Sequence, residues 1–141
     1  MSKSEERREE IIFSVNLQSA IAVYVQIENQ VKFAIASGRL KPDDNLPSVR
    51  DLSVVLGVNP NTVAKAYRDL EIMGLVWARR GVGYIVLEDG VAPCREATRS
   101  AASAHLREAV RECLACGLSM TQINTAVSDA AASGSSPYNE I

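Results

Sequence analysis

The sequence lacks the features that mark several large classes of protein. It has no apolar run near the roughly 20 residues that a membrane-spanning helix needs, and residues 1–10 are charged where a secretion signal would be apolar. Three cysteines are too few for a secreted disulfide framework, and 141 residues are too few for a large multi-domain enzyme. We therefore expect a cytoplasmic protein with one compact domain and a small appendage.

Catalytic patterns are missing as well. The sequence has no glycine-rich phosphate loop, no pair of catalytic carboxylates and no Cys/His nucleophile arrangement, and His105 is the only histidine. We predict no enzymatic activity, no cofactor and no metal site. The net charge of −2 also gives no general attraction to nucleic acid or membranes, so any DNA binding has to come from a local basic patch.

Helical spacing of apolar residues predicts the first part of a domain. A first helix is expected from Ser19 to Ser37, with Gly38 at its C-cap. Ser48, followed three residues later by Asp51, is typical of a helix start, and this short second helix ends near Leu56. Between these helices lies a loop with two prolines, in which Leu46 is expected to turn back into the core.

A tight turn at Gly57 separates the second helix from a third, which Asn59 caps, Pro60 opens and Met73 ends. Tyr67 lies on its predicted buried stripe, so a core position is favoured over a phosphate contact. A β-hairpin follows, with β-prone runs at 75–78 and 84–87 around the basic loop 79–83.

The residues after the hairpin predict a hinge and two more helices. The hinge spans Glu88 to Pro93, and the first helix ends near Gly117. Ser119 and Gln122 then resemble a capping box that opens the last helix. The apolar side chains of these two helices need cover, which a second subunit would supply. The residues expected at that dimer interface are Leu106, Val110, Cys113, Leu114, Ile123 and Val127.

This order of elements predicts a winged helix-turn-helix domain followed by a two-helix C-terminal dimerisation segment, an α+β fold that is mainly α. We expect a flexible N-terminal arm over residues 1–15, which includes a β-prone run that packs on the core or on a second subunit. The winged domain covers 16–90, the helical dimerisation segment 91–135 and a flexible tail 136–141.

Polar side chains at two places suit DNA recognition. Asn61, Thr62 and Lys65 begin the third helix, the part of this motif that reaches base edges in the major groove. Arg79 and Arg80 lie at the hairpin tip, where a wing contacts phosphates or the minor groove. Simpler roles stay open, because Thr62 could serve the helix start and the two arginines could be solvated turn residues.

Several segments together resemble the GntR family of bacterial regulators, and the short C-terminal part is similar to its YtrA subfamily. The resemblance covers residues 24–86 and is carried by Gly38–Pro42, Leu46–Leu52, Leu56–Val63, Ala66–Glu71 and Gly74–Leu75. One departure is that Asp43 stands where the family commonly has glycine after proline, so a positive φ at this position would cost more.

The resemblance implies a dimeric, sequence-specific repressor that binds a palindromic operator, with a transporter operon as a possible target. The DNA-binding residues that it implies, together with those expected at the hairpin tip, are Arg50, Asn59, Asn61, Thr62, Lys65, Arg68, Arg79, Arg80 and Gly81. Among the two helix cations, Lys65 ranks above Arg68. Arg50 has the alternative of pairing with a nearby carboxylate.

Two other functions stay open beside this one. Cys113 and Cys116 form a C-x-x-C pattern, which would suit a thiol- or metal-responsive regulator if the thiols met across a dimer axis. Packing is favoured, because residues three apart share one face of a helix and a second pair of ligands is missing. The other alternative is a winged-helix module that binds protein. The sequence identifies no small-molecule effector.

Overall fold

The computed structural model describes residues 13–134, so residues 1–12 of the predicted arm and the predicted tail at 136–141 lie outside the described residues. The chain divides after Glu96 into two compact units, whereas the sequence predicts a boundary at residue 90. We call them the N-terminal unit and the C-terminal unit. The first helix of the C-terminal part begins inside the N-terminal unit.

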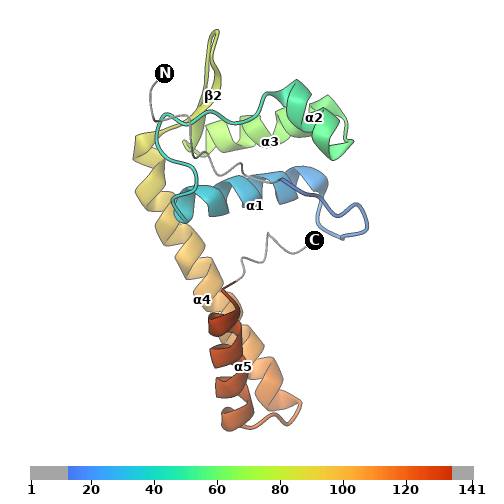
Figure 1. Cartoon of the computed structure of the whole chain (residues 1–141), viewed down its shortest axis with the longest axis vertical. Helices are drawn as coiled ribbons and strands as arrows, with labels where there is room; N and C mark the ends of the chain where they lie inside the picture. Colours follow the sequence, from blue (N-terminus) through green and yellow to red (C-terminus); the bar gives the residue numbers. More distant parts are fainter. Residues whose placement is uncertain (1–12, 135–141) are drawn as a thin grey trace. The chain divides into compact units, whose positions relative to one another are not determined.

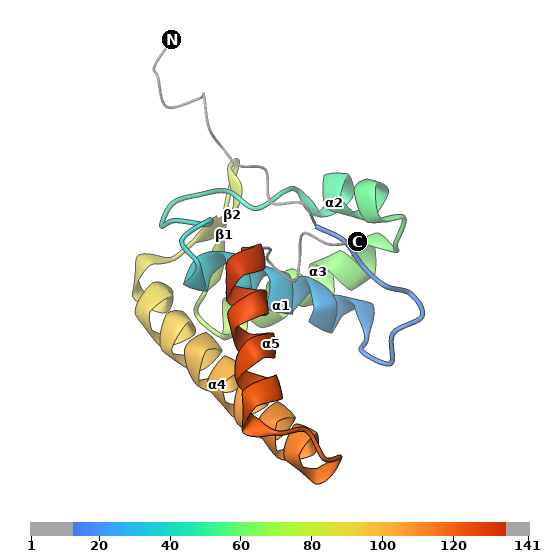
Figure 2. The same ribbon diagram turned by 60° about the horizontal axis from the view of Figure 1, so that its bottom comes forward.

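Three helices form most of the N-terminal unit. They are α1 (Val23–Ala36), α2 (Val49–Leu56) and α3 (Pro60–Ile72). Helices α1 and α3 pack against each other, and α2 packs on α3 (Figures 1 and 2). The caps of α2 and α3 are those that the sequence predicts. Ser48 Oγ accepts a hydrogen bond from Asp51 N at 3.0 Å, and Asn59 Oδ1 accepts one from Asn61 N at 2.8 Å.

The first helix begins at Val23, four residues after the predicted start at Ser19. Polar side chains explain the difference, because they satisfy the backbone of the preceding turn and compete with helix formation. Asn16 Oδ1 accepts from Gln18 N at 2.9 Å, and Ser19 Oγ accepts from Ile21 N at 3.1 Å. The segment before Val23 is therefore a turn.

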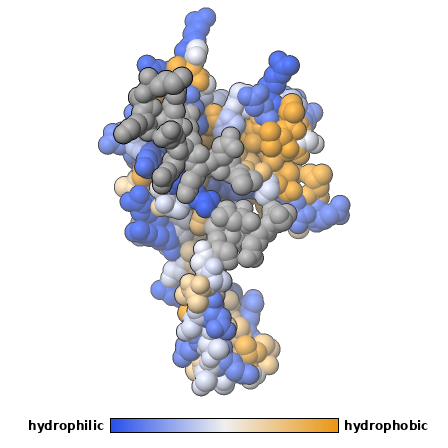
Figure 3. All heavy atoms as spheres, in the orientation of Figure 1, coloured by the Kyte–Doolittle hydropathy of each residue, from blue (hydrophilic) through white to orange (hydrophobic). Residues whose placement is uncertain are grey.

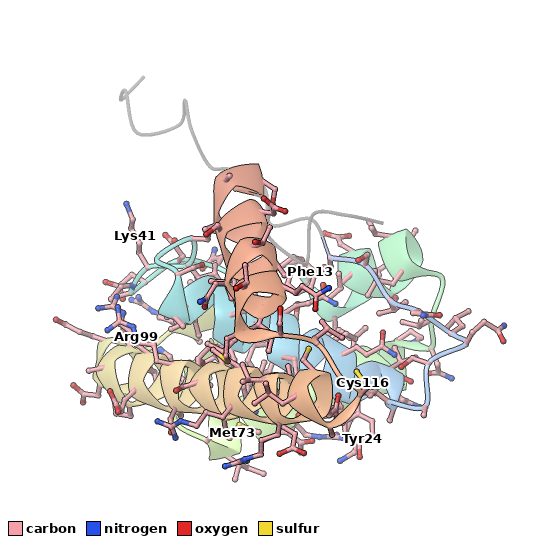
Figure 4. All side chains as sticks on the ribbon, turned by 90° about the horizontal axis from the view of Figure 1, so that it is seen from below. Phe13, Tyr24, Lys41, Met73, Arg99 and Cys116 are labelled. Carbon is pink, nitrogen blue, oxygen red and sulfur yellow. The ribbon has the colours of Figure 1, made fainter. Side chains whose placement is uncertain are left out.

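Residues 13–18, which we call the strap, lie along α1. Phe13, labelled in Figure 4, is buried in the core, and Val15 packs against the core. Gln30 exchanges hydrogen bonds with the backbone N–H and C=O of Ser14, and Gln26 does the same with Asn16 at 2.8 and 3.0 Å. The last three residues of the predicted flexible arm are thus bound to the core of their own chain.

The wing is an antiparallel hairpin of β1 (Val76–Arg79) and β2 (Gly83–Val86), in which Trp77 pairs with Ile85 (Figure 1). Both outer edges carry further hydrogen bonds. On the β2 edge, Leu46 N donates to Tyr84 O at 2.9 Å and Val86 N donates to Asp44 O at 3.0 Å. On the β1 edge, Ala78 N donates to Glu71 Oε2 of α3 at 2.9 Å.

One core joins α1, α3 and the base of the wing. Its fully buried large side chains come from α1 (Ile27, Val31, Ile35), α3 (Val63, Tyr67, Leu70) and the strands (Val76, Val86). Leu46 is also buried, as the sequence predicts. Since every element of the winged fold contributes to this core, the unit forms a core from a single chain.

The loop after α1 keeps a positive φ at a non-glycine residue. Asp43 has φ 69°, and it alone combines a side chain with a positive φ among residues 13–134. Its N–H donates to Val86 O at 2.9 Å, and the next residue, Asp44, bonds to Lys41 N through Oδ2 at 2.9 Å. The hydrogen bonds hold the turn that glycine would adopt at lower cost.

The hinge predicted from Glu88 to Pro93 is helical instead. Glu88–Gly90 form a 3-10 turn, and α4 (Val91–Ala115) follows directly. Proline is tolerated there because Pro93 falls in the first turn, where the amide it lacks has no helical partner. Gly90 fits closely, since a Cβ at this position would lie 2.5 Å from the Gly74 carbonyl oxygen.

The C-terminal unit consists of the rest of α4 and helix α5 (Met120–Ser133), which the capping box of Ser119 and Gln122 opens as predicted. Figure 2 shows the two helices diverging from the turn that joins them. Between residues 97 and 134 the only buried side chain is Ile123. Across residues 13–134, no helix is both long and apolar enough to span a membrane.

Candidate nucleic-acid interface

Helix α3 separates a buried face from an exposed polar face. Val63, Ala66, Tyr67 and Leu70 are buried, whereas Asn61, Lys65 and Arg68 are exposed and Thr62 is half-buried. The exposed set begins in the first turn of the helix, as predicted for a recognition helix. Amide and hydroxyl groups at this end are therefore free to meet a ligand surface.

The first turn of α3 also settles which residue serves as the cap. Asn59 accepts the Asn61 N–H, and within residues 13–134 the Thr62 hydroxyl makes no hydrogen bond. The helix-start role considered for Thr62 thus belongs to Asn59. The amide NH₂ group of Asn59 still has its two donors, since only its oxygen is used by the cap.

Helix α2 presents Arg50 and Val54 four residues apart on one exposed face. The Arg50 guanidinium has no carboxylate partner in the part of the chain that the structure describes, so the pairing alternative receives no support. Val54 and Val55 are both exposed, and Figure 3 shows apolar atoms gathered over α2. The carbonyl of Arg50 accepts from Ser53 Oγ at 2.7 Å, so the hydroxyl of the buried Ser53 has a partner inside the helix.

The tip of the wing is a three-residue turn from Arg80 to Val82. Gly81 has φ 80°, a conformation that costs glycine little, and Val82 N donates to Arg79 O at 3.0 Å. Both arginine side chains are exposed, and neither forms an ion pair within residues 13–134. The turn thus projects two uncompensated guanidinium groups.

Tyr67 connects the recognition helix to the loop before α2. It is fully buried, its hydroxyl donates to Pro47 O at 2.7 Å, and its ring meets the edge of Tyr84 with centroids 5.1 Å apart. Burial, followed by the neighbouring Tyr84, raises the pKa of the Tyr67 hydroxyl far above its usual range. Tyr67 is a core residue that positions α2, α3 and the wing, as the sequence favours.

Lys65 differs from the other predicted contacts because its ammonium group already has partners. Lys65 Nζ lies 3.2 Å from Asp69 Oδ2 and 4.5 Å from the centroid of the Tyr24 ring. Glu28, one turn after Tyr24 on α1, lies close enough to Asp69 for each carboxyl to shift the pKa of the other. We call Tyr24, Glu28, Lys65 and Asp69 the α1–α3 charge cluster; Tyr24 is labelled in Figure 4.

The cluster shifts the ionisation of both carboxyl groups. Burial is the largest cause that raises the pKa of Glu28 to about 7, followed by the hydrogen bond to Asp69. The same hydrogen bond and the one from Lys65 lower the pKa of Asp69. Sequence reasoning missed Glu28, because nothing in the pattern of α1 marks a glutamate beside Ile27 as buried. Glu71, which bonds to a backbone N–H of the wing, was missed because no local signal connects an exposed glutamate of a helix to a strand amide seven residues on.

The residues predicted for dimerisation fall into two groups. Leu106, Leu114 and Val127 are about half exposed, at 55%, 48% and 49%. Val110 and Cys113 are half-buried, while Ile123 is only 6% exposed within a single chain. An apolar surface therefore remains open on the C-terminal unit, and Ile123 is not part of it.

The three cysteines have different environments. Cys94 is buried, with its Sγ 3.4 Å from Lys32 O, which fits the predicted packed thiol. Cys116 is exposed, contrary to the packing favoured from sequence, and its Sγ lies 3.3 Å from Cys113 O. Residues 13–134 contain no group of three or more His, Cys, Asp or Glu side chains that could hold a metal ion.

Comparison with known proteins matches the winged part of the chain. A model of the family described as "Bacterial regulatory proteins, gntR family" matches residues 23–86. The HTH-type transcriptional repressor YtrA of Bacillus subtilis is 40% identical over 78 residues, which are 55% of this chain and 60% of that protein. YhcF of the same bacterium, an uncharacterized HTH-type transcriptional regulator, is 39% identical over 71 residues, which are 50% of this chain and 59% of that protein. The chain thus spans about 60% of the length of these curated relatives.

Solved structures extend the similarity beyond the wing. YtrA from Sulfolobus acidocaldarius, a GntR-family transcription factor, is 37% identical with a TM-score of 0.51, covering 64% of this chain and 95% of that one. A transcriptional regulator from Oenococcus oeni is 29% identical with a TM-score of 0.63, covering 82% of this chain and 95% of that one. The second match includes more of this chain than the winged domain alone.

Proposed function

The chain belongs to the GntR family of bacterial regulatory proteins, and from this premise we propose that it is a sequence-specific DNA-binding transcription regulator. One observation carries the proposal. The exposed arginines of α2 and the wing tip, Arg50, Arg79 and Arg80, have no carboxylate partner within residues 13–134, and they share one unit with the exposed start of α3. A winged helix uses these places for phosphate, minor-groove and major-groove contacts.

Each part of the interface has a distinct task in this proposal. The start of α3 enters the major groove, where the Asn61 amide and the Thr62 hydroxyl hydrogen-bond base edges. Arg50 binds a phosphate beside that groove and fixes the register of the helix. Arg80 follows the turn at Gly81 into the minor groove, where the negative potential favours a guanidinium. Arg68 and Arg79 contribute further phosphate contacts.

We also propose that the protein acts as a homodimer on a palindromic operator. The C-terminal unit supports a dimer, because its half-exposed leucines and valine need cover and a single side chain is buried between residues 97 and 134. Two copies double the phosphate contacts, which matters for a chain with net charge −2. Occupation of promoter DNA would make it a repressor, the activity that the names of YtrA and of NagR from Bacillus subtilis carry.

DNA binding tests this function directly. The purified full-length protein is titrated into a fluorescent duplex from upstream of its own gene and into a shuffled duplex, over a series of salt concentrations. We expect selective binding whose affinity falls steeply with salt. Arg80→Ala and Arg50→Ala should each weaken binding by about tenfold, the effect of losing one good groove or phosphate contact.

Arg99→Ala provides the matched control, since Arg99 is an exposed arginine of the C-terminal unit and the variant loses the same charge. It should bind the duplex within about twofold of the unaltered protein. If Arg50→Ala, Arg80→Ala and Arg99→Ala all bind equally well, the interface is assigned wrongly. If the unaltered protein does not distinguish its upstream DNA and other promoter fragments from shuffled DNA at any salt concentration, the regulator proposal fails.

A further inference from the structure

Glu28 is the most unusual polar residue of the N-terminal unit. Its side chain is 6% exposed, and its Oε1 has no hydrogen-bond partner within residues 13–134. A carboxylate so buried loses hydration that no donor replaces, which favours the neutral form. The other core residues of α1, such as Ile27 and Val31, are apolar, so the acid stands out among them.

The contact between Glu28 and Asp69 requires a proton. Two carboxylates have only acceptor oxygens, so a hydrogen bond between them forms only when one of the pair is protonated. Asp69 is the more exposed partner and faces the Lys65 ammonium at 3.2 Å, so it keeps the charge. Whenever the pair holds a proton, Glu28 therefore carries it and can donate from α1 to Asp69 of the recognition helix.

Three cations lower the pKa values of this pair. Lys32 of α1 and Lys65 of α3 lower the pKa of Glu28. Lys65 and Arg68 lower the pKa of Asp69. The strap adds no charged side chain on its side of α1. Among these cations only Lys65 contacts the pair directly and also lies at the proposed DNA interface. Lys65 thus belongs both to the α1–α3 charge cluster and to the surface that meets DNA.

We propose that the Glu28–Asp69 carboxyl pair couples DNA binding to proton uptake through Lys65. In the free protein, Asp69 and the Tyr24 ring hold the Lys65 ammonium. In the complex, a DNA phosphate draws this ammonium away from Asp69, because the closely spaced phosphates of DNA attract a cation more strongly than one carboxylate does. The pair then loses its nearest cation and gains negative neighbours, so it binds a proton more tightly. DNA affinity accordingly rises as the pH falls through the neutral range.

This inference rests on the proposed function and adds a regulatory input to it. Glu28 and Asp69 are positioning residues, since neither needs to touch the DNA. A lower internal pH would strengthen operator binding, and a higher pH would release it. The coupling works in both directions, so DNA must raise the pKa of Glu28 by the same free energy with which protonation strengthens DNA binding.

A pH series of DNA binding is the first test. Dissociation constants for the upstream duplex are measured at pH 6, 7 and 8 and constant ionic strength, with His105→Asn introduced in every variant so that the single histidine contributes nothing. We expect affinity to fall by about threefold per pH unit, below the tenfold limit for one proton per subunit. Glu28→Gln keeps a donor for Asp69 and should abolish most of the slope. Glu96→Gln, which alters an exposed carboxyl of the same unit, should keep it.

Calorimetry of the same binding reaction counts the protons directly. Binding enthalpies at pH 7.5 in two buffers with different ionisation enthalpies give the number taken up per subunit. The proposal requires a positive fraction of a proton for the His105→Asn protein and a smaller one for Glu28→Gln in that background. Equal proton uptake in the two proteins, or proton release, would overturn it while leaving the regulator function intact.

A measurement on the free protein keeps the test independent of DNA. The carboxyl ¹³C shifts of Glu28 and Asp69 are followed by NMR as a function of pH in the unaltered protein and in Lys65→Met. Removal of the ammonium should raise the pKa of Glu28, as withdrawal of Lys65 to DNA would. A Glu28 pKa that Lys65→Met leaves unchanged would refute the coupling. Because this titration needs no DNA, it distinguishes a failure of the carboxyl pair from a failure of the proposed DNA binding.

Discussion

The two units of the chain differ in whether they form an apolar core of their own. In the N-terminal unit, α1, α3 and the base of the wing share a core in which Ile27, Val31 and Leu70 are fully covered, although other large apolar side chains of this unit stay exposed. Among residues 97–134 of the C-terminal unit, only Ile123 is buried, and Leu106, Leu114 and Val127 stay about half exposed. Both units are helical, so secondary structure does not explain the difference. The first unit forms a core from one chain, and the second leaves most of its large apolar side chains uncovered.

The same difference distinguishes the proposed recognition of DNA from the proposed recognition of a second copy of the chain. The residues proposed to recognise DNA are polar and lie on elements that share a buried core, whereas those proposed to recognise a second copy are apolar and lie in a unit with little core of its own. The N-terminal unit should therefore respond to core substitutions through its own stability. The C-terminal unit should respond through association between chains.

A pair of truncations tests this separation with the largest expected effect. Ile27→Ala should lower the free energy of unfolding by about 3 kcal/mol, because it leaves a cavity in a fully buried site. Leu106→Ala removes a half-exposed side chain and should change the free energy of unfolding of the N-terminal unit by less than about 0.5 kcal/mol. Urea unfolding followed by the fluorescence of Trp77, the single tryptophan, measures this unit in both variants. Equal losses in the two variants would show that the units do not stand apart.

Association is the second point at which the units should differ. Leu106→Glu places a charge on the open apolar surface and should raise the dimer dissociation constant by about 100-fold, or about 2.7 kcal/mol. Leu17→Glu is the matched control, because Leu17 is 67% exposed in the N-terminal unit and receives the same change. Sedimentation velocity over a range of protein concentrations compares them. A dimer that dissociates equally in both variants, or survives both, would place the interface elsewhere.

The pH dependence of stability should be confined to the N-terminal unit. The folded pKa of Glu28 is raised from its ordinary 4.5 to about 7, so the folded state binds the proton more tightly than the unfolded chain. Stability should therefore fall as the pH rises from about 4.5 to about 7, and then level off. Glu28→Gln should remove this fall and gain about 1 to 2 kcal/mol at pH 8 in urea unfolding.

The matched control is Glu108→Gln, which alters an exposed carboxyl of the C-terminal unit. It should keep the fall between pH 4.5 and 7 that the unaltered protein shows. If Glu28→Gln retains the same fall, Glu28 is ionised in the folded state, and the carboxyl pair does not hold a proton.

The smallest expected effect concerns the turn at Asp43. Asp43→Gly relieves a φ of 69° that a side chain disfavours, while it adds freedom to the unfolded chain. The net gain should be about 0.5 kcal/mol, seen as a higher midpoint of the Trp77 unfolding transition. Asp43→Ala keeps a side chain at the same φ and should give no gain. A loss in Asp43→Gly would mean that the Asp43 side chain stabilises the turn.

The sequence predicts most of the winged fold because its signals are local. The caps at Ser48 and Asn59, the turn at Gly57 and the basic hairpin tip each lie within a few residues of the structure that they determine. The predicted start of α1 was wrong, because apolar spacing alone does not reveal that Asn16 and Ser19 hold a turn. The prediction of a hinge after the wing was wrong as well. Proline usually ends a helix, and the sequence does not reveal that a helix starts at Val91, where Pro93 is tolerated in the first turn.

At the proposed DNA interface, too, the sequence predicts local features but not contacts between distant residues. Exposed arginines and the polar start of α3 follow from helix geometry and turn chemistry, so their exposure is predictable. The partners of Lys65 are not, because the contact joins residues on α1 and α3 that are about 40 positions apart in sequence and depends on how the two helices pack. Asp69 is four residues from Lys65, yet its link to Glu28 has no signal in the sequence.

The hydrogen bonds along the two outer edges of the wing affect how readily the protein aggregates through its strands. A two-stranded sheet normally offers two open edges on which another chain can add a strand. Here the Glu71 carboxylate occupies the Ala78 N–H on one edge, and residues 43–46 pair with Tyr84 and Val86 on the other. Sheet-to-sheet aggregation and strand swapping are disfavoured at the wing. Any contact that another chain makes with the wing would therefore use side chains and not the backbone edges of the strands.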